Sequence, residues 1–250
     1  GPTRAGAHRA GRCAPFHLLG RARVGGGLRA WSVGEANLIP GSCRPCGLWQ
    51  HSVSFCVKGE GDRNAPIVLL GEALGEQEDL AGRPFVGRAG ALLDGCLREV
   101  DLLRAEVFIT NSVRCRPLSP AGKNRTPTVA ELGFCRGYLD DELATLPNLK
   151  VIVALGASAA WAALAPHAPT GGVLENQGRA IWSERYRCWV VCSLHPAFIL
   201  RKPSERMWLV MDLVKAKRIA EHGQPLETKQ PRYREVRTLD DAFEMRDDVL

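Results

Sequence analysis

From Pro66 onward the hydrophobic and polar positions repeat one pattern, in which a short apolar run and a turn precede a longer amphipathic stretch. Four of the apolar runs are continuous, which is typical of strands buried on both faces. They are PIVLLG (66–71), EVFITN (106–111), KVIVALG (150–156) and RCWVVCS (187–193). Helical periodicity predicts helices over 90–102, 128–146 and 157–164. This order predicts an α/β fold with a parallel central sheet and helices on both faces.

The loops at the carboxyl ends of the predicted strands are the most informative parts of the chain, because parallel sheets bind their ligands there. Three of these loops, GEALGEQED (71–79), NSVRCRP (111–117) and HPAFILR (195–201), carry unusual chemistry. The fourth, ALGASAAW (154–161), is expected to be structural. Thr128, followed three residues later by Glu131, forms a capping box and predicts where the second helix begins.

Length and composition indicate one catalytic domain, since 250 residues with 45% hydrophobic content build one sizeable α/β core. We expect this domain at 35–221. No apolar run approaches the roughly 20 residues that span a bilayer, and no secretory signal precedes the core. We therefore expect a soluble protein of the bacterial or archaeal cytosol, nucleoid-associated and with no membrane partner.

The two ends of the chain differ from this core. Residues 1–34 contain six arginines and no acidic residue, which equals the whole net charge of +6. We interpret this arm as a disordered leader outside the fold, with a DNA-binding tail or an organellar transit peptide as alternatives. Residues 222–250 are interpreted as a linker followed by an appendage or by the start of a truncated further domain.

Nine cysteines in a chain with no secretory signal favour metal ligation over a disulfide framework. Cys43 and Cys46 form a C-x-x-C pair, and Cys115 and Cys135 follow the second predicted strand. Two close thiols and two distant ones are typical of a closed four-thiolate site, which suits an iron–sulfur cluster or structural zinc. The other five are interpreted as small apolar residues without a metal role: Cys13, Cys56, Cys96, Cys188 and Cys192.

Three polar residues follow predicted strands at the same sheet edge. Glu72 follows the first strand, Asn111 ends the second, and His195 follows the fourth. Each alone is more often a turn former or a structural residue. Together they indicate a catalytic site, because acid–base and hydrogen-bonding groups converge there. Phe85, in a glycine-flanked loop, is either a core residue or a platform on which a base stacks.

Three segments, taken in order, resemble the motifs of the iron–sulfur uracil-DNA glycosylases, the family 4 group of bacteria and archaea. They are GEALGEQEDLAGRPFVGRAGALLD, ITNSVRCRP and LHPAFILRKP, and the resemblance covers about residues 40–220. It implies the uracil-DNA glycosylase superfamily fold and excision of uracil from DNA in base excision repair, with water as the nucleophile. It also implies a [4Fe-4S] cluster on Cys43, Cys46, Cys115 and Cys135.

The same resemblance implies a role for each pocket residue. Phe85 would stack on the flipped uracil, Asn111 would hydrogen-bond the pyrimidine edge, and His195 would meet uracil O2. Glu72 would orient or activate water and stabilise the cationic sugar. Ala73 would line the base site, at the place where the best-known uracil glycosylases keep a water-activating Asp.

The implied partner is uracil-containing DNA, single- or double-stranded, bound by a monomer. Leu200, Arg201 and Lys202 lie where the family inserts a loop into the DNA. Leu74 departs from the family motif, which has Pro there. Flanking basic residues are candidates for contacts with phosphates: Arg114, Arg116, Lys123, Arg125, Arg201 and Lys202.

Three other functions stay open at this point. One is a non-catalytic glycosylase-like DNA-binding domain fused to replication machinery, since the residues after 230 faintly resemble the opening of a proofreading exonuclease domain. Another is the cross-linking branch of the superfamily, which uses a His in a GKRRIH-type loop. The corresponding loop, SPAGKNRTP (119–127), has no histidine, which favours water as the nucleophile. The third is a zinc-stabilised protein-interaction module.

Overall fold

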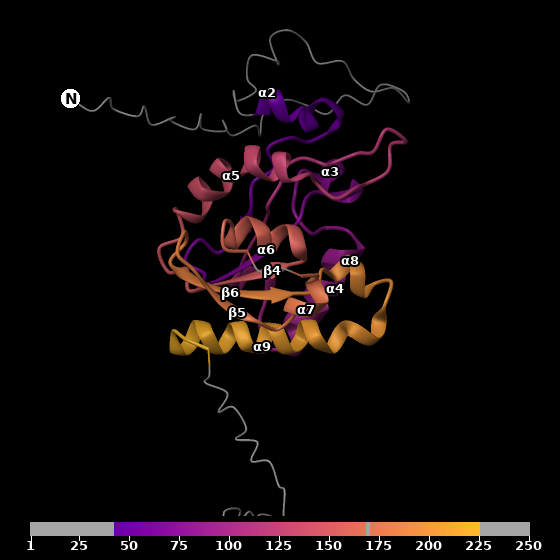
Figure 1. Ribbon diagram of the computed structural model, residues 1–250. Helices are drawn as coiled ribbons and strands as arrows, with labels where there is room; N and C mark the ends of the chain where they lie inside the picture. The colour runs from indigo at the N-terminus through magenta and orange to yellow at the C-terminus, as the bar shows by residue number, and fades with distance from the viewer. Residues whose placement is uncertain (1–42, 169–170, 226–250) are drawn as a thin grey trace, which may run out of the picture.

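The computed structural model describes residues 43–168 and 171–225 of the chain (Figure 1). The predictions for the arm 1–34, for Cys13 and for the chain after 225 lie outside these residues. No helix in the described ranges is long and apolar enough to cross a membrane.

The described residues form a six-stranded sheet in the order β1-β3-β2-β4-β6-β5. Its strands are β1 (Glu60–Gly61), β2 (Ile67–Gly71), β3 (Phe108–Asn111), β4 (Val151–Leu155), β5 (Ala180–Ser183) and β6 (Cys188–Ser193). The four central strands pair in parallel, which confirms the predicted parallel centre. The edge strands β1 and β5 pair antiparallel with β3 and β6, and the hydrophobic pattern does not predict them.

Helices cover both faces of the sheet, as the continuous apolar strands predict (Figure 1). Because successive strand side chains point to opposite faces, Ile67 and Leu69 belong to one core and Val68 and Leu70 to the other. The first core packs against α4 (Arg88–Glu99), α8 (Pro196–Ile199) and α9 (Arg206–His222). The second core packs against α5 (Val129–Leu143) and α6 (Ala157–Leu164).

The three helices predicted from periodicity are α4, α5 and α6, and α6 has the predicted bounds. The capping box is confirmed, because Thr128 Oγ1 accepts from the Glu131 backbone N–H at 3.2 Å and Glu131 Oε2 accepts from the Thr128 N–H at 2.7 Å. Short elements complete the fold: α2 (Cys43–Cys46), η1 (Leu48–His51), α3 (Glu76–Ala81), η2 (Arg104–Glu106), α7 (Val173–Asn176) and η3 (Pro203–Glu205).

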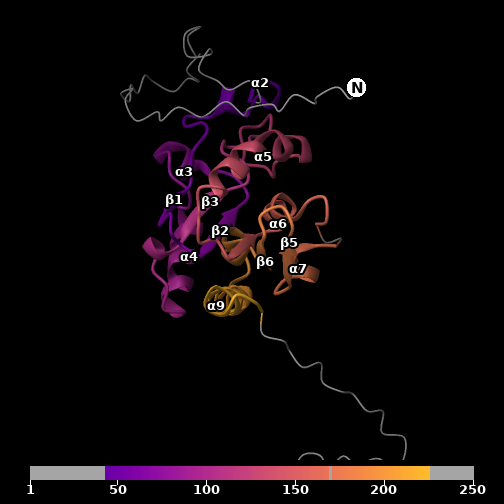
Figure 2. The same ribbon diagram turned by 90° about the vertical axis from the view of Figure 1, so that its left-hand side faces the viewer.

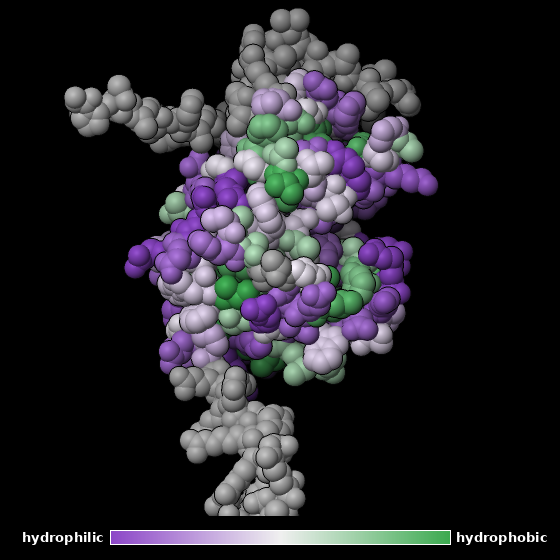
Figure 3. All heavy atoms as spheres, viewed as in Figure 1, coloured by the Kyte–Doolittle hydropathy of each residue, from purple (hydrophilic) through white to green (hydrophobic). Residues whose placement is uncertain are grey.

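A third, smaller core lies away from the sheet, where α2 packs on α5 (Figure 2). It is built from Leu48, Val113, Leu132, Cys115 and Cys135. On the face seen in Figure 3, hydrophobic side chains form separate patches among hydrophilic ones.

An ion pair between Arg114 and Glu142 is buried between β3 and α5, with side chains 4% and 6% exposed. Arg114 Nη2 lies 2.9 Å from Glu142 Oε2, which also accepts from Thr110 Oγ1 at 2.6 Å. Glu142 Oε1 accepts from the Gly59 N–H at 2.9 Å. The prediction that Arg114 holds a DNA phosphate is therefore wrong, because its guanidinium has no access to the surface.

Glu142→Ala should lower the free energy of unfolding by about 3–5 kcal/mol, because it leaves the Arg114 charge buried without its partner. Arg206→Ala is the matched control, since its ion pair with Glu99 is on the surface and far less of its energy survives solvent screening. Equilibrium denaturation of both variants measures the difference. Equal losses in the two variants would contradict the assignment.

Candidate active site

The ends of the parallel strands meet at one edge of the sheet. Gly71 of β2 lies opposite Asn111 of β3, and Leu155 of β4 lies opposite Ser193 of β6. The following loops are also joined, because the Val113 N–H donates to the Glu72 carbonyl at 3.0 Å and the Gly156 N–H donates to the Ser193 carbonyl at 2.9 Å. Glu72, Asn111 and His195 thus follow three strands at the same edge, as the strand order predicts.

Gly71 forms the floor that brings two of the predicted residues together. A Cβ at this position would lie 2.3 Å from Asn111 Oδ1 and 2.6 Å from the Phe85 ring. Neither contact is sterically possible, so a side chain here would displace the amide or the ring. The absence of a side chain at Gly71 lets Asn111 and Phe85 approach the same point of the backbone.

Asn111 presents an unsatisfied acceptor. Its side chain is buried, and among the described residues Oδ1 has no hydrogen-bond partner. A buried acceptor left unpaired lowers the stability of the fold by about 1–3 kcal/mol. A ligand that donates a hydrogen bond to Oδ1 would recover this energy.

His195 lies beside Phe85, with ring centroids 5.9 Å apart and an interplanar angle of 29°. Its Nδ1 accepts from the Ala197 N–H at 3.1 Å and caps α8. Removal of water from around the ring, with a smaller contribution from Arg201, lowers the pKa of His195 to about 4. The imidazole is therefore neutral at physiological pH, and because Nδ1 accepts, Nε2 carries the proton. His195 can donate one hydrogen bond from Nε2.

Glu72 is held by a residue of α6. Ser158 Oγ donates to Glu72 Oε2 at 2.7 Å, while burial raises the pKa of the Glu72 carboxyl. The loop 154–161, expected to be structural, thus also supplies Ser158 as the hydrogen-bond partner of the Glu72 carboxylate. The sequence does offer a signal for Ser158, because it lies in the loop directly after β4, at the same sheet edge as the other site residues.

The other acidic residues of the 71–79 loop lie outside the pocket or have structural partners. Asp79 is buried and accepts from the backbone N–H groups of Val53 and Ser54. Glu76 is exposed. Leu74, which differs from the family motif, is buried in the protein. Of these residues only Glu72 combines burial with a position at the sheet edge.

The four predicted ligand thiols come from three segments: α2, the loop after β3, and α5. Each of the six pairs among Cys43, Cys46, Cys115 and Cys135 interacts electrostatically, and every such interaction disfavours a second thiolate. Burial is the larger effect, and it raises the pKa of Cys135 to about 12. The structure thus makes these four cysteines neighbours.

Backbone groups near the thiols suit negatively charged sulfur. The Cys56 N–H donates to the Cys115 sulfur, and the Arg114 N–H donates to the Cys135 sulfur. Within the described ranges, no three Cys, His, Asp or Glu side chains already stand in a metal-ligating arrangement. The donor chemistry and the grouping of the thiols nevertheless fit a four-thiolate centre.

The cysteine core also contacts segments next to Glu72 and Ser158. Ala73, directly after Glu72, and Trp161, on the same helix as Ser158, both pack against it. The Arg136 guanidinium lies 4.5 Å from the centre of the Trp161 ring. The segments that hold Glu72 therefore rest on the segments that carry the cysteines.

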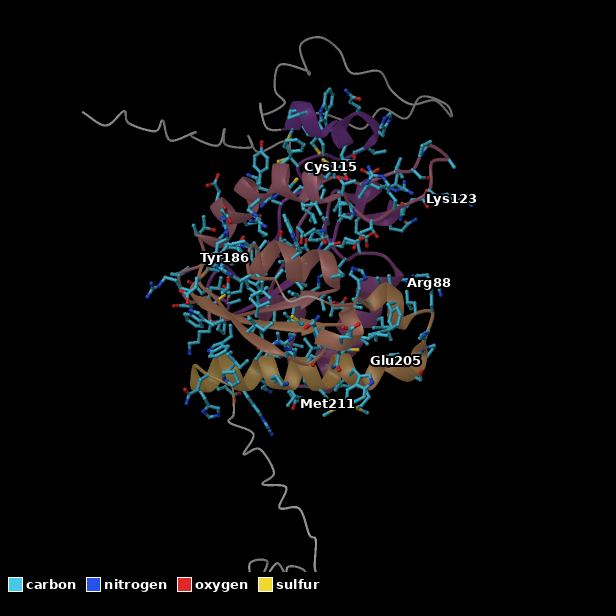
Figure 4. The ribbon with its side chains drawn as sticks, in the orientation of Figure 1. Arg88, Cys115, Lys123, Tyr186, Glu205 and Met211 are labelled. Carbon is cyan, nitrogen blue, oxygen red and sulfur yellow. The ribbon has the colours of Figure 1, made fainter. Side chains whose placement is uncertain are left out.

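The predicted DNA-contacting residues lie at the end of α8, next to His195. Arg201 and Lys202 are exposed and Leu200 is half-buried. Lys123 is exposed in a tight turn, and Figure 4 shows it on the same side of the molecule as Arg88. The other candidates have protein partners, since Arg116 donates to Asn124 Oδ1 and Arg125 pairs with Glu131.

The fold agrees with what comparisons with known proteins find. The model of the uracil DNA glycosylase superfamily matches residues 58–217, and the chain belongs to this superfamily.

Within it, the chain is similar to enzymes described as Type-4 uracil-DNA glycosylase. Three of these come from Sulfurisphaera tokodaii (37% identity, covering 72% of this chain and 80% of the relative), Thermotoga maritima (38%, 70% and 88%) and Archaeoglobus fulgidus (37%, 74% and 91%).

His195 should remain neutral, with its proton on Nε2, down to about pH 4. Folding lowers this pKa, so the unfolded chain binds the proton first and the His195 contribution to stability is lost as pH falls from about 6.5 towards 4. Nitrogen-detected NMR of labelled imidazoles measures both the midpoint and the tautomer. A midpoint near 6.5, or a proton on Nδ1, would contradict the site geometry.

Proposed function

We propose that this chain hydrolyses the N-glycosidic bond between uracil and deoxyribose in DNA, with water as the nucleophile. The observation that carries the proposal is Asn111 Oδ1, which is buried and has no hydrogen-bond partner among the described residues, next to the Phe85 ring that stacks on His195. Similarity to Type-4 uracil-DNA glycosylases over most of both chains supports the same activity.

Asn111 would select the base. Uracil presents the N3–H donor beside the O4 acceptor, and a side-chain amide offers an acceptor and a donor in the complementary order. Cytosine presents an acceptor at N3 and an amino group at C4, which would leave both amide groups facing like groups. Rejection of this kind is strong, because mismatched buried polar groups stay unpaired. Phe85 would stack on the face of the selected base.

His195 and Glu72 would divide the charge that develops when the bond breaks. The electron pair of the C1′–N1 bond leaves with uracil, so negative charge gathers on O2, where the His195 Nε2–H can donate. The sugar becomes cationic, and the Glu72 carboxylate, oriented by Ser158, stabilises that charge. Water adds its oxygen to C1′ and its proton passes to Glu72 or to solvent. The uracil anion takes up a proton from solvent, so the products are uracil and an abasic strand.

The remaining contacts would bring the base out of the DNA. A base must leave the stack before an enzyme can reach it. Leu200 is proposed to enter the DNA, while Arg201 and Lys202 contact phosphates on either single- or double-stranded substrate. Ala73 would line the base site beside Glu72. We propose that a monomer carries out the reaction.

His195→Ala and Asn111→Ala should each lower the single-turnover rate of uracil release by about a hundredfold, because each removes one oriented group at the leaving base. His167→Ala and Asn148→Ala are matched controls, since they replace the same residue types at exposed positions. Both controls should excise at the wild-type rate.

Other results of this assay would favour the rival functions. No uracil release by the wild-type protein, with binding to DNA retained, would indicate a non-catalytic DNA-binding domain. A band on a denaturing gel at the mass of protein plus DNA would indicate the cross-linking branch. Full activity in both pocket variants would contradict the proposed roles.

We propose further that Cys43, Cys46, Cys115 and Cys135 hold a [4Fe-4S] cluster. Their grouping and the backbone N–H groups aimed at two of the sulfurs support this ligand set. When bound, the cluster would supply covalent cross-links between α2, the loop after β3, and α5. These bonds would support the Ala73 and Trp161 contacts behind Glu72.

Cys115→Ala should remove the visible iron–sulfur absorbance and lower the melting temperature, because one bond to the cluster is lost. Cys188→Ala is the control, since Cys188 is buried in the core around α6 and takes no part in the grouping. Metal analysis of the purified proteins completes the test. If the wild-type protein contains zinc and no iron, the four cysteines form a structural zinc site and the cluster assignment is wrong.

A further inference from the structure

Phe85 has a backbone conformation that only its surroundings can maintain. Its φ is +49°, in the left-handed region that a residue with a side chain rarely adopts. The same residue places its ring against Gly71 and His195. The position of the ring therefore depends on whatever holds residues 84–87 in this strained turn.

Arg104, in η2, donates hydrogen bonds to two carbonyls of the turn. Its Nη2 donates to the Pro84 carbonyl at 2.7 Å, and its Nη1 donates to the Phe85 carbonyl at 3.1 Å. The planar guanidinium fixes both carbonyls at once, which a single donor cannot do. Glu60 and Asp94 orient the guanidinium by accepting from it at 2.7 and 3.1 Å.

Two further features close the turn. Glu78 Oε1 accepts from the backbone N–H groups of Val86 and Gly87 at 3.0 and 2.8 Å. Gly90 of α4 lies so close that a Cβ there would be 1.8 Å from the Phe85 carbonyl oxygen. The turn therefore has partners for both its carbonyls and its amides, and Arg104 is the residue that binds the strained position itself.

We propose that Arg104 is a positioning residue for uracil excision, acting through the carbonyls of Pro84 and Phe85 to hold the Phe85 ring where the base stacks. This inference rests on the proposed function. Arg104 itself touches no reacting group, since its donors are used by the two carbonyls and the two carboxylates. Without it, the turn relaxes and the ring leaves the pocket floor.

Arg104→Ala should lower the single-turnover excision rate on the order of ten- to a hundredfold, as small displacements at a reaction site do. Arg83→Ala is the matched control, because Arg83 also binds Glu60 but makes no contact with the carbonyls of the turn. Its rate should stay near that of the wild type. If Arg104→Ala does not fold, Arg104→Lys is used in its place, since Lys keeps the positive charge but lacks the planar guanidinium that binds both carbonyls.

A double-mutant cycle separates positioning from a general structural role. In a Phe85→Ala background, Arg104→Ala should have no further effect on excision, because the ring it positions is already absent. The same loss in both backgrounds, or a wild-type rate in Arg104→Ala, would overturn the proposal.

NMR provides a readout that needs no activity. The Phe85 ring lies 5.9 Å from the His195 ring, so its ring current should shift the His195 proton resonances. In Arg104→Ala those resonances should move towards their values in Phe85→Ala, and in Arg83→Ala they should not move. Unmoved resonances in Arg104→Ala would sink the inference even if excision is observed. A wild-type protein that excises no uracil, with the resonances moving as expected, would instead overturn the proposed function.

Discussion

The parallel pairing of β2 with β3, which sets Gly71 opposite Asn111, is the constraint on which the rest of the site depends. A shift of one residue would turn every side chain of β3 to the other face of the sheet. Asn111 would then leave the pocket, and the apolar residues of β3 would exchange cores. The burial of Ile109 in one core and Phe108 in the other therefore fixes the position of the functional amide.

The pocket groups reduce the stability of the protein without a ligand. Loss of water raises the pKa of Glu72 and lowers the pKa of His195, so both favour their neutral forms. Among the described residues, Asn111 Oδ1 is buried without a hydrogen-bond partner. Phe85 adds a left-handed backbone. Burial of the four apolar strands and of the helices on both faces offsets these losses of stability. Local rules broken together at one sheet edge are typical of a functional site.

Most of the fold can be predicted from the sequence, because four continuous apolar runs and a capping box record burial and helix start directly. Glu72, Asn111 and His195 can be predicted as a group from strand order alone. The edge strands leave no continuous apolar pattern, because β1 has only two residues and β5 is mostly not buried. The roles of Ser158 and Arg104 cannot be predicted from the sequence, because both depend on contacts with segments that are distant along the chain. The same holds for Arg114, whose buried partner Glu142 is also distant in sequence.

Binding of the free base to the labelled protein tests the pocket most directly. Uracil and cytosine are titrated separately while NMR follows the Asn111 side-chain amide and the His195 Nε2–H. The account predicts saturable shifts of both signals with uracil and none with cytosine. Among the described residues Asn111 Oδ1 has no hydrogen-bond donor, and uracil N3–H supplies one. Equal shifts with both bases, or no shift with uracil, would contradict it.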